Sequence, residues 1–367
     1  MTLGFTIHRD TLADAINTIA RTLPARPNIP VLAGVLINAT PDGVILSGFD
    51  YEVSTQTRVT AENTTAGAAL VSGKLLAGIT KALPNKPVTI TETPGRVTLA
   101  CGAAKFTLPT MPVEDYPQLP ELPTTAGKID TDLFTSAAGQ VLSAVGKDDT
   151  LPMLTGVRVE IDGPQIVMAA TDRFRLAIRT LEWEPDTTGF ETAFLVPGKT
   201  LTEVTKSFAT HAPIELSISD TLLGIVNNGT RTTTRLLDAE FPKFRQLLPK
   251  EHTAQAVIDV DELTQAVKRV SLLAERGAQV RLEFTEGTVT LTAGGDELGR
   301  AEERLSIEFE GEPLTIAFNP GYLLDGLNAV KSELVRFGFT TANRPAILQP
   351  TDSDGFTYLL MPVRLPS

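Results

Sequence analysis

The segment Pro197-Gly198-Lys199-Thr200 carries the residue types that end a phosphate-binding loop, in which glycine amides and a lysine hold nucleotide phosphates. The full motif also needs a glycine five positions before Gly198, and Ala193 stands there. Pro197 removes one backbone N–H group that such a loop would point at phosphate. A nucleotide-binding enzyme that uses Gly198-Lys199-Thr200 is therefore the alternative interpretation, and we expect a structural turn instead.

The other residues with the chemistry for catalysis or metal binding are dispersed along the chain. His8, His211 and His252 have no neighbours at the spacing of a metal site, and we expect them at the surface or between domains. Asp148 and Asp149 form an acidic pair, but no base or nucleophile stands near them in the sequence, so a solvated turn is expected. The sequence therefore predicts no catalytic residues, no metal site and no cofactor.

Cys101 is the only cysteine, which excludes a disulfide framework and fits a reducing cytoplasm. It ends the strand-like segment 97–101, where we expect a packed thiol. The first residues lack the basic and apolar layout of a secretion signal, and no apolar run has the length of a membrane helix. We therefore expect a cytoplasmic protein without membrane contact.

The length of 367 residues predicts two or three domains rather than one. Apolar residues make up 42% and charged residues 21% of the chain, as in a folded globular protein. The net charge of −12 argues against a protein that coats nucleic acid through a uniformly basic surface. It still allows DNA binding through a separate basic face.

A turn that contains glycine recurs three times along the chain. Its glycines, Gly73, Gly198 and Gly321, are separated by 125 and 123 residues, a period far longer than that of solenoid repeats. Strand-like segments between the turns include 43–47, 165–169 and 288–292. Ahead of each turn, apolar residues recur at helical spacing: Leu12, Ile16, Ile19 and Leu23; then Phe134, Ala137, Ala138, Val141, Leu142 and Val145; then Leu263, Ala266, Val267, Val270 and Ala274.

The first two repeats also end alike, with Asp-Tyr-Pro at 115–117 and Glu-Phe-Pro at 240–242. We therefore expect breaks near Pro123 and Lys250. Each repeat has the pattern of an α+β domain, with two helices packed on antiparallel sheets. The predicted domains are an N-terminal one over 1–123, a central one over 124–250 and a C-terminal one over 251–367.

The helix predicted after each glycine has an apolar face, and in two repeats it also has a lysine face. Three and six positions after the glycine stand Leu76 and Ile79, Leu201 and Val204, and Leu324 and Leu327. Nearly opposite, at about 100° per residue, stand Lys74 and Lys81, then Lys199 and Lys206, and in the third repeat Tyr322 and Ala329. Two interpretations remain open, a solvated face and a stripe that faces phosphate. Basic residues on or next to the helices before the turns would add to the stripe: Arg21, Arg26, Lys147, Lys268 and Arg269.

Four local motifs resemble the bacterial DNA polymerase III sliding clamp, the beta subunit, and the resemblance covers the whole chain. They are Arg26-Pro27 before Pro30-Val31-Leu32, Ala-Thr-Asp-Arg-Phe-Arg-Leu-Ala at 170–177, Phe-Pro-Lys-Phe through Leu-Pro at 241–249, and Tyr-Leu-Leu-Met-Pro-Val-Arg-Leu at 358–365. The second and fourth are similar to clamps of high-GC Gram-positive bacteria. The chain departs from the family pattern at Arg173 and Phe174, where some members have Gly-His.

The resemblance implies a non-catalytic processivity factor built from three clamp domains. Two copies would form a head-to-tail homodimer, a six-domain ring whose helices line a hole around duplex DNA without sequence preference. The replicative polymerase alpha subunit, the clamp loader, repair polymerases and ligase would bind it through short peptides. The second alternative is a repeat protein that binds only other proteins, with solvated lysines.

The resemblance also implies three sets of site residues. A peptide pocket would comprise Leu154, Thr171, Arg173, Leu176, Pro242, Leu247, Tyr322, Leu360, Met361, Pro362, Val363 and Arg364. The DNA-facing set would be Arg26, Lys74, Lys81, Lys147, Lys199 and Lys206. The dimer contact would involve Lys105, Phe106 and Leu108 on one side and Leu272, Leu273, Glu302 and Glu303 on the other.

Overall fold

The computed structural model describes residues 2–24, 26–209, 212–274, 279–295, 299–353 and 355–364. The chain divides into two compact units. The first holds residues 1–132, 183–188 and 199–236, and the second holds residues 133–182, 189–198 and 237–367. The division runs through the middle repeat. In the described part of the chain, no helix has the length and apolarity to cross a membrane.

The first unit is organised around one antiparallel sheet, in which each strand pairs with its neighbours through backbone hydrogen bonds. Its strands lie in the order β14 (Glu184–Pro185), β10 (Thr125–Ile129), β16 (Ile214–Ile218), β17 (Leu222–Asn227), β18 (Thr230–Arg235), β4 (Val53–Val59), β3 (Gly43–Phe49), β2 (Gly34–Thr40), β6 (Gly67–Ser72), β9 (Ala104–Met111), β8 (Arg96–Cys101), β7 (Pro87–Thr93), β1 (Gly4–His8) and β5 (Glu62–Thr65). The pairing of β4 with β18 joins strands of the first two repeats into one sheet.

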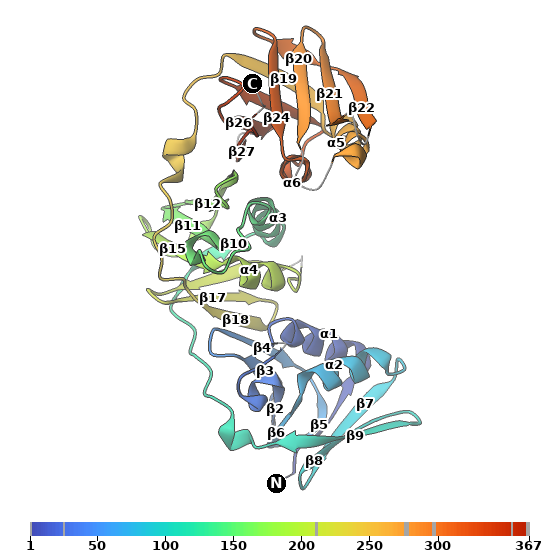
Figure 1. The fold of residues 1–367 in the computed structure, drawn as a ribbon. Helices are drawn as coiled ribbons and strands as arrows, with labels where there is room; N and C mark the ends of the chain where they lie inside the picture. The colour runs from blue at the N-terminus through green and yellow to red at the C-terminus, as the bar shows by residue number, and fades with distance from the viewer. Residues whose placement is uncertain are drawn as a thin grey trace. The chain divides into compact units, whose positions relative to one another are not determined.

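Two helices of the first unit, α1 (Arg9–Ala20) and α2 (Gly73–Ala82), lie side by side against the sheet (Figure 1). The apolar side chains of α1 and of strands β1 to β3 and β6 to β8 form a single buried core, in which Leu12, Ile16 and Val35 are fully buried. Helix α4 (Gly198–Thr205) belongs to the middle repeat. Along the chain, the 3₁₀ helix η1 (Pro30–Ala33) lies just before β2, and η2 (Val113–Asp115) lies just after β9.

The second unit contains two antiparallel sheets. The larger has the order β15 (Glu191–Pro197), β11 (Gly156–Asp162), β12 (Gln165–Thr171), β13 (Arg175–Glu182), β27 (Phe356–Leu360), β26 (Ala346–Pro350), β25 (Leu334–Phe339), β19 (Ala254–Asp259) and β23 (Glu308–Glu310). The smaller has the order β22 (Gly299–Ser306), β21 (Thr288–Gly295), β20 (Val280–Thr285) and β24 (Leu314–Phe318).

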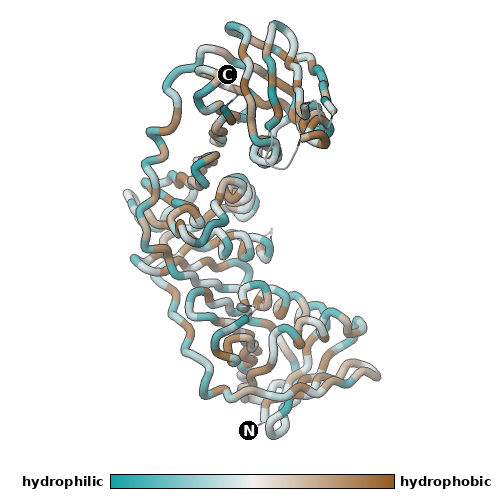
Figure 2. Tube along the Cα trace, in the orientation of Figure 1, coloured by the Kyte–Doolittle hydropathy of each residue, from teal (hydrophilic) through white to brown (hydrophobic). Residues whose placement is uncertain are grey.

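The helices of the second unit are α3 (Thr131–Leu142, of which 133–142 lie in this unit), α5 (Val260–Val270) and α6 (Pro320–Ala329). Helices α5 and α6 lie side by side, as α1 and α2 do (Figure 1). Short 3₁₀ helices are η3 (Pro152–Leu154), η4 (Phe244–Leu247) and η5 (Ser271–Leu273). Hydrophobic residues recur along the helices and strands of both units (Figure 2), because one side of each element packs against the core.

The predicted elements are confirmed, with corrections at helix ends. Segments 43–47, 165–169 and 288–292 lie in β3, β12 and β21. Leu23, Val145 and Ala274, expected as the last apolar positions of three helices, lie beyond the ends of α1, α3 and α5. In α6 the buried residues are Leu323, Gly326, Leu327 and Ala329, so Ala329 does not lie on an exposed face, and Leu324 is only half-buried. This helix begins at Pro320, one residue before the repeated glycine, which turns its buried face by one position.

The glycine-containing turn is a strand-to-helix junction in all three repeats. Strand β6 leads directly into α2, β15 into α4, and β24 through Asn319 into α6. The Ser72 hydroxyl accepts the N–H of Leu75 at 3.5 Å, and Asn319 Oδ1 accepts the N–H groups of Gly321 and Tyr322 at 2.9 and 3.2 Å. These side chains satisfy N–H groups that a helix leaves free at its start.

Candidate functional site

The turn that imitates a phosphate-binding loop is used for packing. The N–H of Gly198 donates to the carbonyl of Thr155 at 2.9 Å, so it is not free for a phosphate. A Cβ atom at Gly198 would lie 2.9 Å from both that carbonyl oxygen and Val145 Cγ1, which explains the glycine. Thr200 is buried, whereas Lys199 is exposed. The expectation of a structural turn is confirmed at this position.

The histidines and acidic residues do not assemble into a metal centre among the described residues, where no group of three or more potential metal ligands occurs. His8 Nδ1 accepts the N–H of Asp10 at the start of α1. His252 is half-buried, and burial lowers its pKa. His211 lies outside the described residues. The Cys101 thiol is buried and lies 3.4 Å from the Pro84 carbonyl oxygen, as a packed thiol would.

A tight loop between β12 and β13 presents two side chains of the predicted pocket region to solvent. Asp172 Oδ1 accepts the N–H groups of Phe174 and Arg175 at 3.0 and 3.1 Å. The Thr171 hydroxyl donates to the Arg175 carbonyl at 2.7 Å and accepts the N–H of Arg173 at 3.2 Å. Arg173 has φ 81°, a left-handed conformation that is uncommon for a residue other than glycine. Arg173 and Phe174 are therefore held outward, and Phe174 is 50% exposed.

Arg175, which the sequence did not single out, fastens this loop to α6 and β27. Its Nε donates to Asp172 Oδ2 at 3.0 Å, and its Nη1 contacts Asp325 Oδ2 and lies 3.4 Å from the Tyr358 hydroxyl. Its guanidinium lies 4.5 Å from the centre of the Tyr322 ring, a cation–π distance. Only 6% of the Arg175 side chain is exposed. Charge-assisted bonds of this kind are strong when water is excluded.

Tyr322 and Tyr358 complete the connection between the loop and α6. Burial raises the pKa of the Tyr358 phenol, which therefore stays protonated and donates to the Tyr322 carbonyl at 2.9 Å. The Tyr322 ring stacks on the Phe174 ring, with centroids 5.9 Å apart. The two aromatic rings therefore form one wall whose position depends on Arg175 and Tyr358.

This wall borders a cavity of about 350 Å³. Of the residues predicted for the peptide pocket, Leu154, Arg173 and Tyr322 line it. Lys147, predicted to face DNA, lines it as well, because the chain turns back after α3 and the N–H of Gly146 donates to the Leu154 carbonyl at 2.8 Å. The other residues around the cavity are Val145, Gly146, Asp148, Leu151, Asp172, Phe174 and Arg175.

Asp148, at the cavity edge, belongs to the expected turn. Its Oδ1 accepts the hydroxyl and the N–H of Thr150 at 2.6 and 3.0 Å. These two hydrogen bonds lower the pKa of the carboxyl, and Arg173 adds a smaller electrostatic contribution. The carboxylate is exposed. The cavity therefore has an apolar and aromatic floor, with Lys147, Arg173 and Asp148 as its charged rim.

The remaining predicted pocket residues fall into three groups. Thr171, Leu176 and Leu360 are buried beneath the loop and do not face a ligand directly. Met361, Val363, Pro362 and Arg364 follow β27, and the N–H of Met361 donates to the Phe174 carbonyl at 2.9 Å, which places this tail beside the loop. Pro242 lies on the segment 239–246, which borders a second cavity, and Leu247 directly follows this segment.

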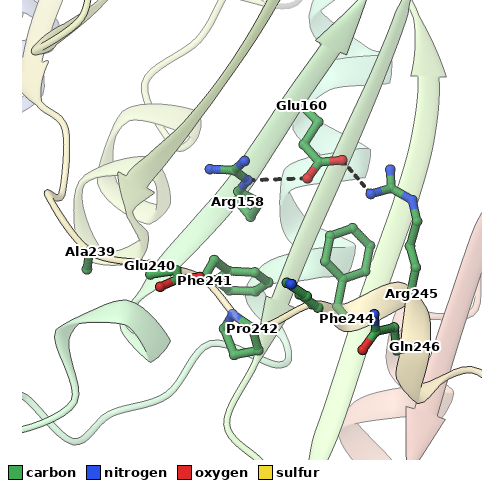
Figure 3. A pocket seen from close by; sticks show the side chains of 10 residues that line it. Arg158, Glu160, Ala239, Glu240, Phe241, Pro242, Phe244, Arg245 and Gln246 are labelled. Carbon is green, nitrogen blue, oxygen red and sulfur yellow. Dashed lines mark hydrogen bonds and ion pairs between the residues drawn. The ribbon is translucent and has the colours of Figure 1, made fainter.

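The second cavity, of about 400 Å³, is shown in Figure 3. Glu160 bridges two arginines there, with its Oε1 3.3 Å from Arg158 Nε and its Oε2 2.6 Å from Arg245 Nη1. The Arg245 guanidinium lies 4.6 Å from the centre of the Phe244 ring. Phe241 and Phe244 are buried and pack in an edge-on arrangement. Pro242 closes this cavity rather than the one beside Tyr322.

The predicted DNA-facing residues differ in their surroundings. Lys74, Lys81, Lys199 and Arg26 are exposed. Lys206 lies just past the end of α4, and its Nζ is 2.8 Å from Glu203 Oε1. The ion pair reduces the positive field that Lys206 presents, which the lysine spacing alone did not reveal.

The predicted dimer residues lie mostly on exposed edges. Leu272 is 83% exposed, and Phe106 and Leu273 are partly exposed, whereas Leu108 is buried in the core of the first unit. Glu303 is already paired within the chain, since Arg269 Nε lies 3.0 Å from its Oε2. Glu302 lies 3.1 Å from Arg304 Nη2. Glu303 therefore has a partner on α5 and Glu302 one on its own strand before any second chain approaches.

The three strand-to-helix repeats, the paired helices and the cavity beside Tyr322 define a three-repeat α+β protein of the clamp type with a ligand-sized pocket. Models of the DNA polymerase III beta subunit match the chain consecutively: the N-terminal domain at residues 3–120, the central domain at 128–243 and the C-terminal domain at 245–364. The chain belongs to the DNA polymerase III beta subunit family, the beta sliding clamps.

Relatives and solved structures agree with this assignment. The beta sliding clamp of Streptomyces coelicolor is 45% identical, with 98% of each chain covered. That of Micrococcus luteus is 45% identical over 84% of this chain and 100% of its own. A Pseudomonas aeruginosa sliding clamp bound to griselimycin has a TM-score of 0.94 at 28% identity, with 100% of both chains covered. The resemblance, the three-repeat fold and the expectation of a non-catalytic polymerase subunit are confirmed, and the nucleotide-binding alternative gains no support.

Proposed function

We propose that the chain is a processivity clamp: two copies close a ring around duplex DNA, and the cavity beside Tyr322 holds a short peptide of the replicative polymerase. The observation that carries the proposal is this cavity of about 350 Å³, walled by the stacked Phe174 and Tyr322 rings next to the C-terminal tail. A short peptide is the ligand that fits, because one exchangeable contact has to serve several partners in turn.

Within the pocket, the residues divide by role. Leu154 forms the floor, and the two aromatic rings form a wall for an apolar anchor of the peptide. Arg173 and Arg364 are exposed donors for peptide carbonyls or for a glutamine side chain. Met361 and Val363, both partly exposed, extend the apolar surface along the tail, and Met361 adapts to different ligands. Thr171, Leu176 and Leu360 support the loop from beneath, and Pro242 and Leu247 continue the surface along the segment 239–247.

For DNA, the exposed lysines Lys74, Lys81 and Lys199, with Arg26, are the groups proposed to approach phosphates. Contacts with phosphate position a protein on duplex DNA and carry no sequence information. Lys206 would contribute less because of its ion pair with Glu203. Lys147 would act at the rim of the peptide cavity.

The ring would close through strand edges of two copies. Residues 104–109 of β9 pair with β8, and in the described chain their other edge has no partner strand. Strand β22 is the end strand of its sheet and pairs with β21 along its whole length. Free strand edges pair readily with another chain, and the exposed Phe106 and Leu272 would add an apolar contact. A head-to-tail contact of this kind closes only if the rotation permits it.

Three further points belong to the same proposal. The domains would extend over 1–123, 124–250 and 251–367, with breaks near Pro123 and Lys250. The partners would be the polymerase alpha subunit, the clamp loader, repair polymerases and ligase, all through short peptides. The location would be the cytoplasm, where bacterial DNA is replicated.

A topological assay tests the function. The protein is loaded on nicked circular plasmid with a clamp loader and isolated on the DNA, and half of the sample is then linearised. A ring should stay on the circle and slide off the linear ends within minutes. Retention on linear DNA, or equal loss from the intact circle, would contradict the proposal and favour a protein that binds DNA along a groove or not at all.

A further inference from the structure

The first repeat contains a copy of the loop that forms the candidate pocket in the second. Asp50 Oδ1 accepts the N–H groups two and three residues ahead at 3.0 and 2.7 Å, as Asp172 does one repeat later. Tyr51, the residue after Asp50, has φ 73° and corresponds to Arg173, the residue after Asp172, which has φ 81°. A left-handed conformation at a bulky aromatic residue is strained. The surrounding structure therefore enforces the same loop shape with different side chains.

The strand that borders this loop is copied as well. The N–H of Arg235, at the end of β18, donates to the Glu52 carbonyl at 2.9 Å. In the second repeat the N–H of Met361 makes the same bond to the Phe174 carbonyl, also at 2.9 Å. The backbone frame around the candidate pocket is thus present twice in one chain, once in each unit.

A groove of about 710 Å³ accompanies the first copy. Residues 116–122 form one side of it, and Leu36, Gln56 and Arg231 of strands β2, β4 and β18 form the other. This groove is the first-repeat counterpart of the cavity in Figure 3. Leu36 pairs with Ser47, three residues before Asp50, and Arg158 pairs with Ala169, three residues before Asp172. Leu36 and Arg158 therefore occupy the same position in the two repeats. Likewise, Tyr-Pro at 116–117 stands where Phe-Pro stands at 241–242.

The floor of the groove is apolar and well packed. Val31, Phe49, Leu70 and Tyr116 form a buried cluster, and Leu36, Val113 and Leu119 pack against it while lining the groove. The Tyr51 ring contacts the Phe49 ring at a centroid distance of 5.4 Å. Two large side chains of this region are exposed, Tyr51 to 46% and Ile29 to 45%. The first copy therefore offers an apolar surface that continues from the groove to the copied loop.

The charges of the two copies differ in a way that selects the ligand. The cavity in Figure 3 carries the cations Arg158, Lys243 and Arg245 and the anions Glu160 and Glu240. Among the described residues that line the first groove, only Glu121 and Arg231 are charged. Gln56 and Gln118 supply amide groups that can both donate to and accept from a peptide backbone. This chemistry fits an uncharged, extended segment with apolar anchors.

We propose that the groove beside residues 116–122 is a second peptide site of the clamp, which takes an uncharged extended segment rich in leucine and glutamine. The inference rests on the proposed function, because it assumes that a peptide held beside Tyr322 continues along the segment 239–247 and the cavity of Figure 3, whose first-repeat counterpart is this groove. Two sites per chain would let one partner hold the clamp at two points, which strengthens binding through effective concentration.

The test is a titration of the full-length protein with a fluorescent Gln-Leu-rich polymerase-type peptide. Two binding events per chain are expected, the second at least tenfold weaker than the first. A variant that lacks residues 361–367 should lose the tighter event and keep the weaker one. Leu36→Arg, which introduces the residue of the second repeat, should remove the weaker event alone, and the matched Arg158→Leu should leave it intact.

Gln118→Asp is a second variant that should not disturb folding, because Gln118 is exposed and the change adds only a negative charge. It should weaken the second event at least fivefold for a peptide with added aspartates and less for the uncharged one. A single binding event per chain in the unaltered protein, together with no binding to the truncated variant, would overturn the second site and leave the proposed function standing. No binding to the unaltered protein would instead overturn the proposed function.

Discussion

Replacing Arg175 with methionine should loosen the loop 171–175 and the pocket that it supports. Methionine replaces the apolar stem of the side chain and removes the guanidinium, with its charge and all its donors. Arg175 and Asp172 are 6% and 14% exposed, so the change leaves a carboxylate in a poorly hydrated position. Removing one partner of a buried ion pair costs about 3–5 kcal/mol. We expect a local destabilisation near the lower limit, because Asp172 Oδ1 keeps its two backbone N–H donors.

The matched control is Asp325→Asn. Asp325 makes the other carboxylate contact of Arg175, but its side chain is 49% exposed. Ion pairs of exposed groups contribute about 0–1 kcal/mol, and the amide oxygen of asparagine still accepts a hydrogen bond. The two variants remove charge from the same network, and the difference in burial predicts a several-fold difference in the local stability that they remove.

Native-state hydrogen exchange measures that difference, because it reports local opening without global unfolding. A loss of about 3 kcal/mol corresponds to roughly a hundredfold faster exchange in the segment 170–180, at tenfold per 1.4 kcal/mol. Asp325→Asn should accelerate exchange less than about fivefold, and Arg175→Lys should fall between them because lysine lacks the planar fork. Peptide affinity should follow the same order. Equal effects of Arg175→Met and Asp325→Asn, or unchanged exchange in Arg175→Met, would show that the buried ion pair does not hold the loop.

Four other outcomes are expected. Deletion of residues 361–367 should abolish binding of the polymerase peptide at the pocket in calorimetry, while sedimentation still finds a dimer; unchanged tight binding would place the site elsewhere. Leu272→Ala combined with Leu273→Ala should shift the protein to monomer in sedimentation. Because the Leu272 side chain is 83% exposed, its replacement should cost little folding stability within one chain. Replacing Lys74, Lys81, Lys199 and Lys206 with glutamate should weaken loading and DNA-stimulated synthesis without changing the dimer. Lys206→Glu should be the mildest single change, because Lys206 is paired with Glu203. Burial lowers the pKa of His252 below 6.5, so the unfolded chain binds this proton more readily and stability should fall as the pH drops below about 6.5; His252→Asn should show a shallower loss in urea unfolding between pH 7.5 and pH 5, and parallel curves would exclude the histidine.

The buried Arg175 illustrates what the sequence did not predict. An arginine near the start of a strand would ordinarily be assigned to solvent, since charged residues are rarely buried without partners. Its partners Asp325 and Tyr358 are 150 and 183 residues away along the chain. Lys147 is a similar case, because its place beside the cavity follows from the return of the chain after α3. The pairing of Glu303 with Arg269 likewise depends on how β22 packs near α5.

Features that depend on local periodicity and on the positions of glycine and proline could be predicted from the residues alone. Three glycine turns, the apolar faces of the helices before them and the missing glycine at Ala193 were sufficient to predict three α+β repeats and to reject a phosphate-binding loop. Side-chain period fixes which face of an element is apolar, and that information is local. The tertiary structure decided which faces meet: it joined Arg173, Leu154 and Tyr322 around one cavity, placed Pro242 at another, and buried Leu176 and Leu360 beneath the loop. Those outcomes depend on strand register across segments far apart in the chain, such as Arg175 opposite Leu360, which no local pattern contains.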